Sequence, residues 1–334
     1  GKHDASWIGL TLANQQHWSI LPLGLDLYDG LPGVALFLAY LGEAAGEARY
    51  TALAQRAVAT LQGQLKAGQS LVPGIGGFCG WGGIVYALTH LGSLWDQPAL
   101  LAEAEAIVEL IPTLVEGDEQ FDIISGAAGC IGGLLALYRC VPRDRTLAAA
   151  AQCGHHLLTY AQPMPSGLGW LPKGIADRPL TGFSHGAAGI AWALLQLAMV
   201  TGEERLRAAA LAAMGYERSL FSAAEGNWPD LRSVESSRMA VDEGNSTFAM
   251  AWCHGAPGIG LSRLLCLRHF NDLPIRSEIE AALQTTLVRG FGNNHSLCHG
   301  DLGNLELLLE ASLTLGEPRW RADADSIAAM ILES

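Results

Sequence analysis

The sequence predicts an all-α protein with the architecture of an α/α toroid, in which a layer of inner helices is surrounded by outer helices. Three observations lead to this class. A G-x-x-G pattern recurs six times, an apolar run of about 10 to 12 residues follows each copy, and a more charged amphipathic run separates the copies. No segment alternates apolar and polar residues as a half-buried β-sheet would. A repeat of helical hairpins therefore accounts for the chain.

The inner helices are predicted from the apolar runs, because a helix that is apolar almost all round must be buried on several sides. These runs begin at Gly30, Gly80, Gly126, Gly186, Gly255 and Gly300. The outer helices are predicted from the amphipathic runs at residues 48–66, 96–115, 144–160, 203–220, 275–290 and 319–332. An open stack of hairpins needs polar end caps, and the last apolar run, at 302–315, is little more polar than the others. A closed toroid is therefore favoured over a hairpin stack that only binds a partner.

The length and composition are those of one large domain or of two tightly joined ones, and we expect a single domain spanning residues 1–334. Half of the residues are hydrophobic, and 20 Lys and Arg against 33 Asp and Glu give a net charge of −13. Disorder is therefore excluded, and a nucleic-acid partner is not expected because no basic patch is available for phosphate. The seven cysteines, in no disulfide-scaffold spacing, favour a reduced cytoplasm. We expect no signal peptide, because residues 1–10 lack a basic segment followed by an apolar core. We expect no transmembrane segment, because glycines, Pro73 and His90 interrupt the longest uncharged stretch, at 67–95.

The residues just before each first glycine are polar or able to bind metal. They are Asp29, Cys79, Ser125, His185, His254 and His299. One position further back the sequence has Tyr28, Phe78, Ile124, Ser184, Cys253 and Cys298. In a toroid whose inner helices run in the same direction, equivalent positions lie on one rim, so these side chains are expected to converge on a common site.

Cys253, Cys298 and His299 are the strongest metal candidates in this register, because Zn²⁺ prefers thiolate and imidazole ligands. Three protein ligands would leave a fourth position open for a substrate. His185 and His254 are further candidates, and the repeat alone does not choose among the histidines. The alternative is that these are buried cysteines beside hydrogen-bonded histidines. The cysteines at 130, 140, 153 and 266 lie in apolar runs and are expected in the core.

Asp122 is a candidate because it lies four residues before Gly126, in the segment that leads into the third apolar run. A carboxylate at a helix entry is often only an N-cap of the helix that follows, and the sequence alone favours this interpretation.

Three segments together resemble the lanthionine synthetase C-like cyclase family: GFSHGAAGI at 182–190, WCHGAPGIG at 252–260 and SLCHGDLGN at 296–304. The beginning, from WIGL at residue 7 to DLYDGLPGVALFLAYLG at 26–42, is similar to the start of the cyclase domain in the C-terminal half of class II lanthipeptide synthetases. The resemblance covers nearly the whole chain. It implies a zinc-containing α/α toroid with seven inner helices, against the six clear glycine-started copies. A seventh pair would have to be less regular or built partly from the first 25 residues.

The resemblance also implies an activity, the addition of peptide cysteine thiols to dehydroalanine or dehydrobutyrine to form thioether rings. Cys253, Cys298 and His299 match the family's zinc ligands, His185 matches its proposed general acid or base, and Asp122 matches the acidic companion. His185 is the first choice for protonating the enolate at the α-carbon, because an imidazole is poised near neutral pH.

Two departures from the family limit this transfer. Many free-standing cyclases have Tyr where this chain has His254, and Arg where it has Ala249. The roles of that Tyr and Arg therefore do not carry over, and His254 competes with His185 as the enolate acid.

Other functions of α/α toroids fit the residues of this register less well. A prenyltransferase would need a basic diphosphate pocket, and a toroidal glycosidase would need paired carboxylates; the register here holds mainly His, Cys and Ser. The non-catalytic alternative is a zinc-containing toroid that binds a peptide or glutathione. The expected partner is a dehydrated lanthipeptide precursor. No kinase-like motif is present, so the dehydratase domain of a longer synthetase is expected to be missing from this chain.

Overall fold

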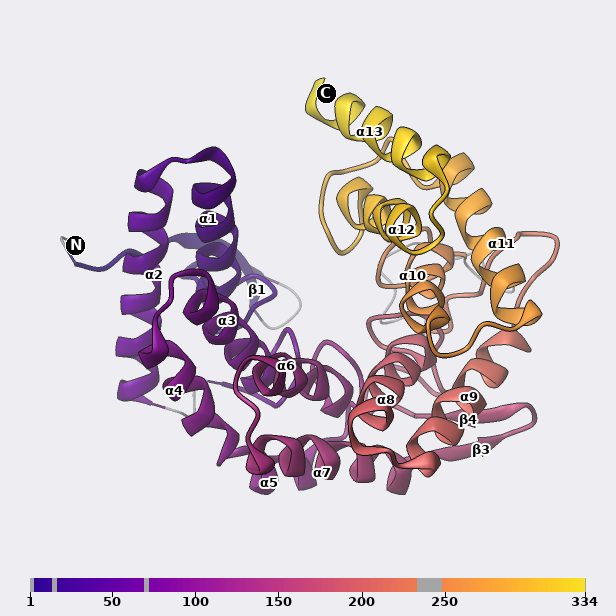
Figure 1. Cartoon of the computed structure of the whole chain (residues 1–334), viewed down its shortest axis with the longest axis horizontal. Coiled ribbons are helices and arrows are strands. Elements are labelled where there is room, and N and C mark those ends of the chain that lie inside the picture. Colours follow the sequence, from indigo (N-terminus) through magenta and orange to yellow (C-terminus); the bar gives the residue numbers. More distant parts are fainter. Residues whose placement is uncertain (1–2, 14–16, 69–71, 233–247, 334) are drawn as a thin grey trace. The chain divides into compact units, whose positions relative to one another are not determined.

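A computed structural model describes residues 3–13, 17–68, 72–232 and 248–333 of the chain (Figure 1). The chain divides into two compact units. The first holds residues 1–118 and 124–156, and the second holds residues 119–123 and 157–334. The single domain spanning 1–334 remains a prediction.

The first unit is built from helical hairpins in which a glycine-started helix packs on a more polar one. α1 (Leu31–Ala45) packs on α2 (Ala48–Ala67), and α3 (Trp81–Leu94) packs on α4 (Pro98–Val108) as well as on α1 and α6 (Ala127–Cys140). The short α5 (Ile111–Leu114) and the 3-10 turn η2 (Val115–Gly117) precede α6. α7 (Asp144–Tyr160) begins in this unit.

The second unit repeats the same hairpin. α8 (Ala187–Thr201) packs on α9 (Glu204–Arg218), α10 (Ala256–Leu267) on α11 (Leu273–Arg289), and α12 (Asp301–Thr314) on α13 (Pro318–Glu333). α10 lies between α8 and α12 and contacts both. A core of Ala188, Trp228, Ala256, Ile259 and Ala282 joins α8, α10 and α11.

The burial pattern confirms the predicted inner and outer helices. In α3 nearly every residue from Trp81 to Gly92 is buried, as the all-round apolar run predicts. In α2 only Ala54, Ala57, Val58 and Leu61 are buried, a single stripe at helical spacing. Among the described residues, six glycine-started helices are found at the six predicted places.

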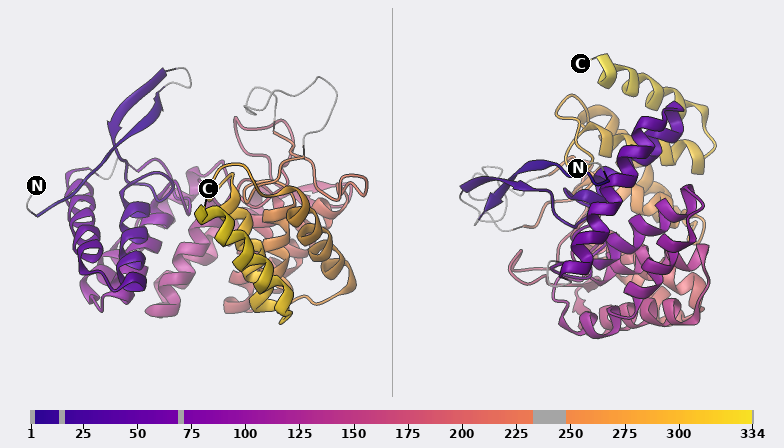
Figure 2. Two further views of the ribbon diagram at one scale, coloured as in Figure 1. Left: turned by 90° about the horizontal axis from the view of Figure 1, so that it is seen from above. Right: turned by 90° about the vertical axis from the view of Figure 1, so that its left-hand side faces the viewer.

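The expectation of no β structure was wrong. β1 (Ile8–Ala13) pairs antiparallel with β2 (His17–Pro22), and the short strands β3 (Gln162–Met164) and β4 (Gly167–Gly169) form a second hairpin. The β1–β2 hairpin projects from the helices of its unit (Figure 2). Its apolar residues do alternate: Ile8, Leu10, Trp18 and Ile20 are each more than 60% exposed. The described residues among the first 22 therefore supply no helix of a seventh pair.

The structure also bears on the predicted core cysteines and on membrane-spanning helices. Cys130, Cys153 and Cys266 are buried as expected, but Cys140 is exposed because it is the last residue of α6. Within the described part of the chain, no helix is both long enough and apolar enough to cross a membrane.

Candidate functional site

The G-x-x-G pattern marks a recurring turn in which the chain folds back on the start of each inner helix. In four of the six copies the residue after the first glycine donates its N–H to the carbonyl seven residues earlier, as in Ala187 to Leu180 (3.0 Å) and Asp301 to Asn294 (2.7 Å). In the other two, Ala127 and Ala256 donate to the side chains of Asp118 and Asn227. The second glycine leaves room for the backbone of the loop that precedes the helix. A Cβ at Gly258 would lie 1.9 Å from the carbonyl oxygen of residue 252. The glycines are therefore required by close backbone approach.

Backbone hydrogen bonds join these turns from one repeat to the next. In the second unit Ile123 N–H donates to Ser184 O (3.0 Å), Ser184 N–H donates to Cys253 O (3.2 Å), and Cys253 N–H donates to Cys298 O (3.4 Å). The Ser184 hydroxyl also donates to Cys253 O, at 3.2 Å. The expectation that equivalent residues converge is confirmed within this unit, because the repeat register itself forms the hydrogen-bonded chain.

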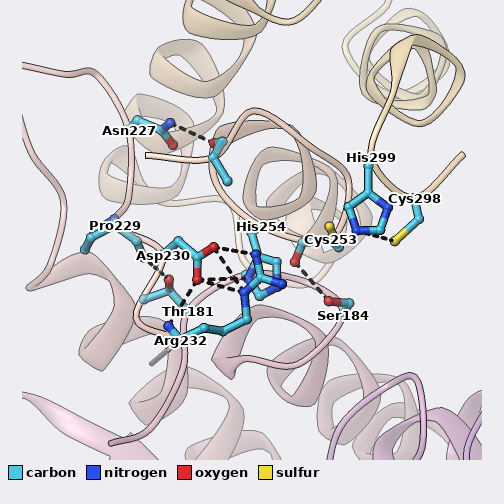
Figure 3. A network of polar contacts seen from close by, with 12 residues as sticks. Thr181, Ser184, Asn227, Pro229, Asp230, Arg232, Cys253, His254, Cys298 and His299 are labelled. Atoms are coloured by element: carbon cyan, nitrogen blue, oxygen red, sulfur yellow. Dashed lines mark hydrogen bonds and ion pairs between the residues drawn. The ribbon is translucent and has the colours of Figure 1, made fainter. Parts of the chain in front are cut away.

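The structure brings Cys253, Cys298 and His299 together. One ligand atom from each lies within 4.8 Å of the others, and Cys298 Sγ lies 3.8 Å from His299 Nε2 (Figure 3). Cys253 is buried, Cys298 is half-buried and His299 is exposed. The cluster is therefore open on the side of His299.

The side chains of the cluster shift one another's pKa values. The interaction with Cys298, together with burial, raises the pKa of the Cys253 thiol. Cys298 also raises the pKa of His299, against the effect of burial. Donors at about 2.3 Å (sulfur) and about 2.0–2.1 Å (nitrogen) from a tetrahedral zinc ion are separated by about 3.5–3.8 Å. The spacing and the soft donors therefore fit a three-ligand zinc site.

His185 and Asp122 form a second polar pair in the same unit. His185 Nδ1 lies 2.5 Å from Asp122 Oδ2, and the Asp122 side chain is fully buried while that of His185 is 24% exposed. The first backbone N–H of α6 is met instead by Asp118 Oδ2, at 2.8 Å. Asp122 thus orients the imidazole and leaves Nε2 for other partners, which is the arrangement of a base–orienter pair.

His254 lies under this pair. Its ring stacks on that of His185, with centroids 5.8 Å apart, and only 1% of its side chain is exposed. Burial lowers the pKa of His254 to about 3, against the opposing charge of Asp230. His254 is therefore a neutral imidazole at neutral pH.

A buried ion-pair network supports the loop that carries His185. Glu217 Oε1 accepts the N–H of Gly182 at 2.8 Å, and Gly182 adopts a positive φ of 100° beside the carbonyl of Cys253. Arg263 bridges Glu217 (2.9 Å) and Glu278 (2.5 Å). Burial raises the pKa of Glu217, and Arg263 opposes the rise. The network fixes the backbone just before His185.

Sequence reasoning missed two residues beside the ligands, Asp230 and Arg232. Both lie in the loop after α9. The Thr181 hydroxyl holds this loop in place by donating a hydrogen bond to Pro229 O at 2.5 Å (Figure 3). Asp230 Oδ1 lies 4.0 Å from His254 Nδ1. They occur in one copy only, so the repeat gives no signal for them.

The fold and the site together define an all-α protein of repeated helical hairpins, with a Cys/Cys/His cluster that could hold a metal ion and a His–Asp pair in the same unit. The chain belongs to the lanthionine synthetase C-like protein family, which it matches over residues 22–334.

Two solved structures share the fold. Nisin cyclase matches with a TM-score of 0.73 and 22% identity over 93% of this chain and 82% of that one. A cellobiose 2-epimerase from Bacillus thermoamylovorans B4167 matches with a TM-score of 0.55 and 12% identity over 88% and 84%. At these identities the similarity concerns the fold, and it confirms the predicted α/α toroid class.

A relative in sequence is the lacticin 481/lactococcin biosynthesis protein LcnDR2 of Lactococcus lactis subsp. lactis. It is 27% identical over 139 residues, which are 39% of this chain and 14% of that protein. The chain thus matches a small part of a much longer relative.

Proposed function

We propose that this chain is a zinc-dependent cyclase that adds cysteine thiols of a dehydrated lanthipeptide precursor to dehydroalanine or dehydrobutyrine, forming (methyl)lanthionine thioether rings. The observation that supports it most is the Cys253, Cys298 and His299 cluster in the same unit as the His185–Asp122 pair, in a member of this family. A module that only binds zinc and a peptide or glutathione has no need of an oriented imidazole.

Zinc at Cys253, Cys298 and His299 would accept the substrate sulfur in its fourth position and favour the thiolate, which is otherwise only about 3% of a free cysteine at pH 7. The protein residues then have two tasks. The ligand loops hold the sulfur donors in place through the Ser184, Cys253 and Cys298 backbone bonds. His185 and Asp122 supply the proton that the α-carbon gains.

His185 is the proposed proton donor to the α-carbon. Attack of sulfur on the β-carbon forms the S–C bond and moves the C=C electron pair toward the carbonyl oxygen, so the enolate must gain a proton at the α-carbon. Asp122, buried against Nδ1, stabilises the positive charge on the ring while Nε2 exchanges the proton. His254 is the competing donor; stacked on His185 and neutral, it is better suited to fixing the orientation of that ring.

The partners and location of the chain follow from the same proposal. A precursor must reach the site already dehydrated, so a dehydratase acts first. It is supplied by another part of a longer synthetase, as the length of the LcnDR2 relative suggests. The seven cysteines form no disulfide with one another, as metal-ligating thiols require, which favours the cytoplasm.

The test is incubation of a pre-dehydrated, cysteine-containing peptide with the zinc-loaded protein, followed by a thiol-alkylating reagent and mass spectrometry. Each ring consumes one thiol, so the product should lose alkylation sites without a change in its own mass. The Cys298→Ala variant is the matched control. Equal alkylation with wild type, with Cys298→Ala and with no protein would contradict the proposal.

A further inference from the structure

The Asp230–Arg232 pair is fixed beside the metal cluster but takes no part in holding it (Figure 3). Arg232 Nε donates to both carboxylate oxygens of Asp230 at 3.1 Å, and Nη2 donates to Oδ2 at 2.6 Å. The Asp230 side chain is 4% exposed. A fork of this kind holds the guanidinium plane in one orientation.

The pair leaves part of the guanidinium available. Among the described residues no acceptor is found for Arg232 Nη1, and the side chain is 21% exposed. The positive charge of Arg232 also interacts with Cys253 and Cys298. Arg232 opposes the rise in the pKa of Cys253, and its own pKa is raised because Asp230, Cys253 and Cys298 outweigh the effect of burial. The Nη1 N–H groups, which meet no acceptor among the described residues, therefore belong to a guanidinium whose charge interacts with Cys253 and Cys298.

The proposed addition needs a donor that no residue has yet supplied. As sulfur bonds to the β-carbon, the electron pair of the C=C bond moves onto the acceptor carbonyl, whose oxygen becomes an enolate oxygen. Protonation of the α-carbon then restores the carbonyl. A pre-oriented N–H aimed at the developing negative charge lowers the barrier, and a donor fixed in advance costs no reorganisation during the reaction.

We propose that Arg232 is a further catalytic residue, which donates from Nη1 to the acceptor carbonyl oxygen as it becomes an enolate, and that Asp230 is its positioning residue. This inference rests on the proposed function. Its geometry is the two-nitrogen fork to Asp230, which fixes the guanidinium and leaves Nη1 with no acceptor among the described residues. Asp230 Oδ1 itself lies 4.0 Å from His254 Nδ1, so the pair borders the His254 ring.

Binding of two small thiols to the zinc-loaded protein tests the assignment without turnover. In 3-mercaptopropionate the sulfur and a carboxylate oxygen are spaced as the sulfur and enolate oxygen are in the adduct, and 3-mercaptopropanamide has the same shape without the charge. By calorimetry, wild type should bind the carboxylate roughly 10-fold or more tightly than the amide. Arg232→Gln should lose this preference and keep the affinity for the amide.

Further variants separate catalysis from stability. Arg232→Gln paired with Asp230→Asn leaves no buried carboxylate unpaired, and should have unchanged zinc content and KM but a kcat lower by roughly 10² to 10³. Arg232→Lys should recover part of kcat. Arg289→Gln, which breaks an exposed ion pair with Glu225 (3.1 Å), should behave as wild type.

Each outcome bears on the assignment. Equal preference for the carboxylate in wild type and Arg232→Gln, or an unchanged kcat in the double variant, would overturn the role of Arg232 and leave the proposed function standing. If wild type binds neither thiol and closes no rings, the proposed function fails and the role of Arg232 fails with it.

Discussion

Gly303 is predicted to be required by contact with the ligand loop. An added Cβ would lie 1.7 Å from the carbonyl oxygen of Leu297, the residue before Cys298, so that oxygen must move by 3.0 − 1.7 = 1.3 Å before the contact reaches even 3.0 Å. Overpacking costs about 1–3 kcal/mol of unfolding free energy, and the upper end applies here because the obstructing atom belongs to the backbone. Alanine regains up to about 1 kcal/mol in helix propensity. We therefore expect Gly303→Ala to lower the free energy of unfolding by about 2 kcal/mol.

The assays are urea denaturation of the zinc-loaded protein and chelator competition for zinc. Gly303→Ala should lower both the free energy of unfolding and the zinc affinity, because the carbonyl that moves is bonded to the Cys298 backbone. Gly63→Ala is the control: it lies within α2 and its Cβ would meet nothing within 4 Å, so it should gain about 0.5–1 kcal/mol. A Gly303→Ala protein as stable as wild type, with undiminished zinc affinity, would refute the reasoning.

Four other outcomes are expected. Cys298→Ala should lower zinc content and stability together, because metal binding and folding are coupled; full occupancy by elemental mass spectrometry would remove it from the ligand set. His185→Ala should keep its zinc and close rings about 10² to 10⁴-fold more slowly, whereas loss of zinc would make it a ligand. His254→Asn should leave deuterium uptake at the α-carbon unchanged, since burial holds its pKa near 3; mixed stereoisomers would give it a role in protonation. The pKa of Asp230 is lowered, chiefly because Arg232 outweighs the effect of burial. Asp230→Asn should therefore be less stable than wild type at pH 7, and thermal melts should show the gap closing below about pH 4.

The helical repeat was predictable because its signal is local. The amphipathic run at 144–160 became α7 with the same bounds, and each glycine pair marked a real turn because backbone carbonyls pack against it. The β1–β2 hairpin was missed although Ile8 and Leu10 alternate on one strand and Trp18 and Ile20 on the other. The glycine repeat drew attention to helices, and two six-residue strands are a short pattern.

The ligand candidates were predictable from register, and the surrounding polar residues were not. Cys253 and Cys298 occupy the same position in successive copies, and the repeat places them together. Asp230 and Arg232 depend on how one loop after α9 returns to the site. Neither periodicity nor spacing encodes that return, because it is fixed by single contacts such as the Thr181 hydroxyl on the Pro229 carbonyl.

Ring closure in heavy water tests the central claim most directly, because addition and protonation leave separate marks on one product. Each thioether formed by the proposed route should remove one alkylatable thiol and place one non-exchangeable deuterium on an α-carbon, as tandem mass spectrometry can locate. We predict equal numbers of lost thiols and incorporated deuterons with wild type, and neither with Cys298→Ala. A peptide that keeps all its thiols and gains no deuterium in the presence of the zinc-loaded protein would contradict the account.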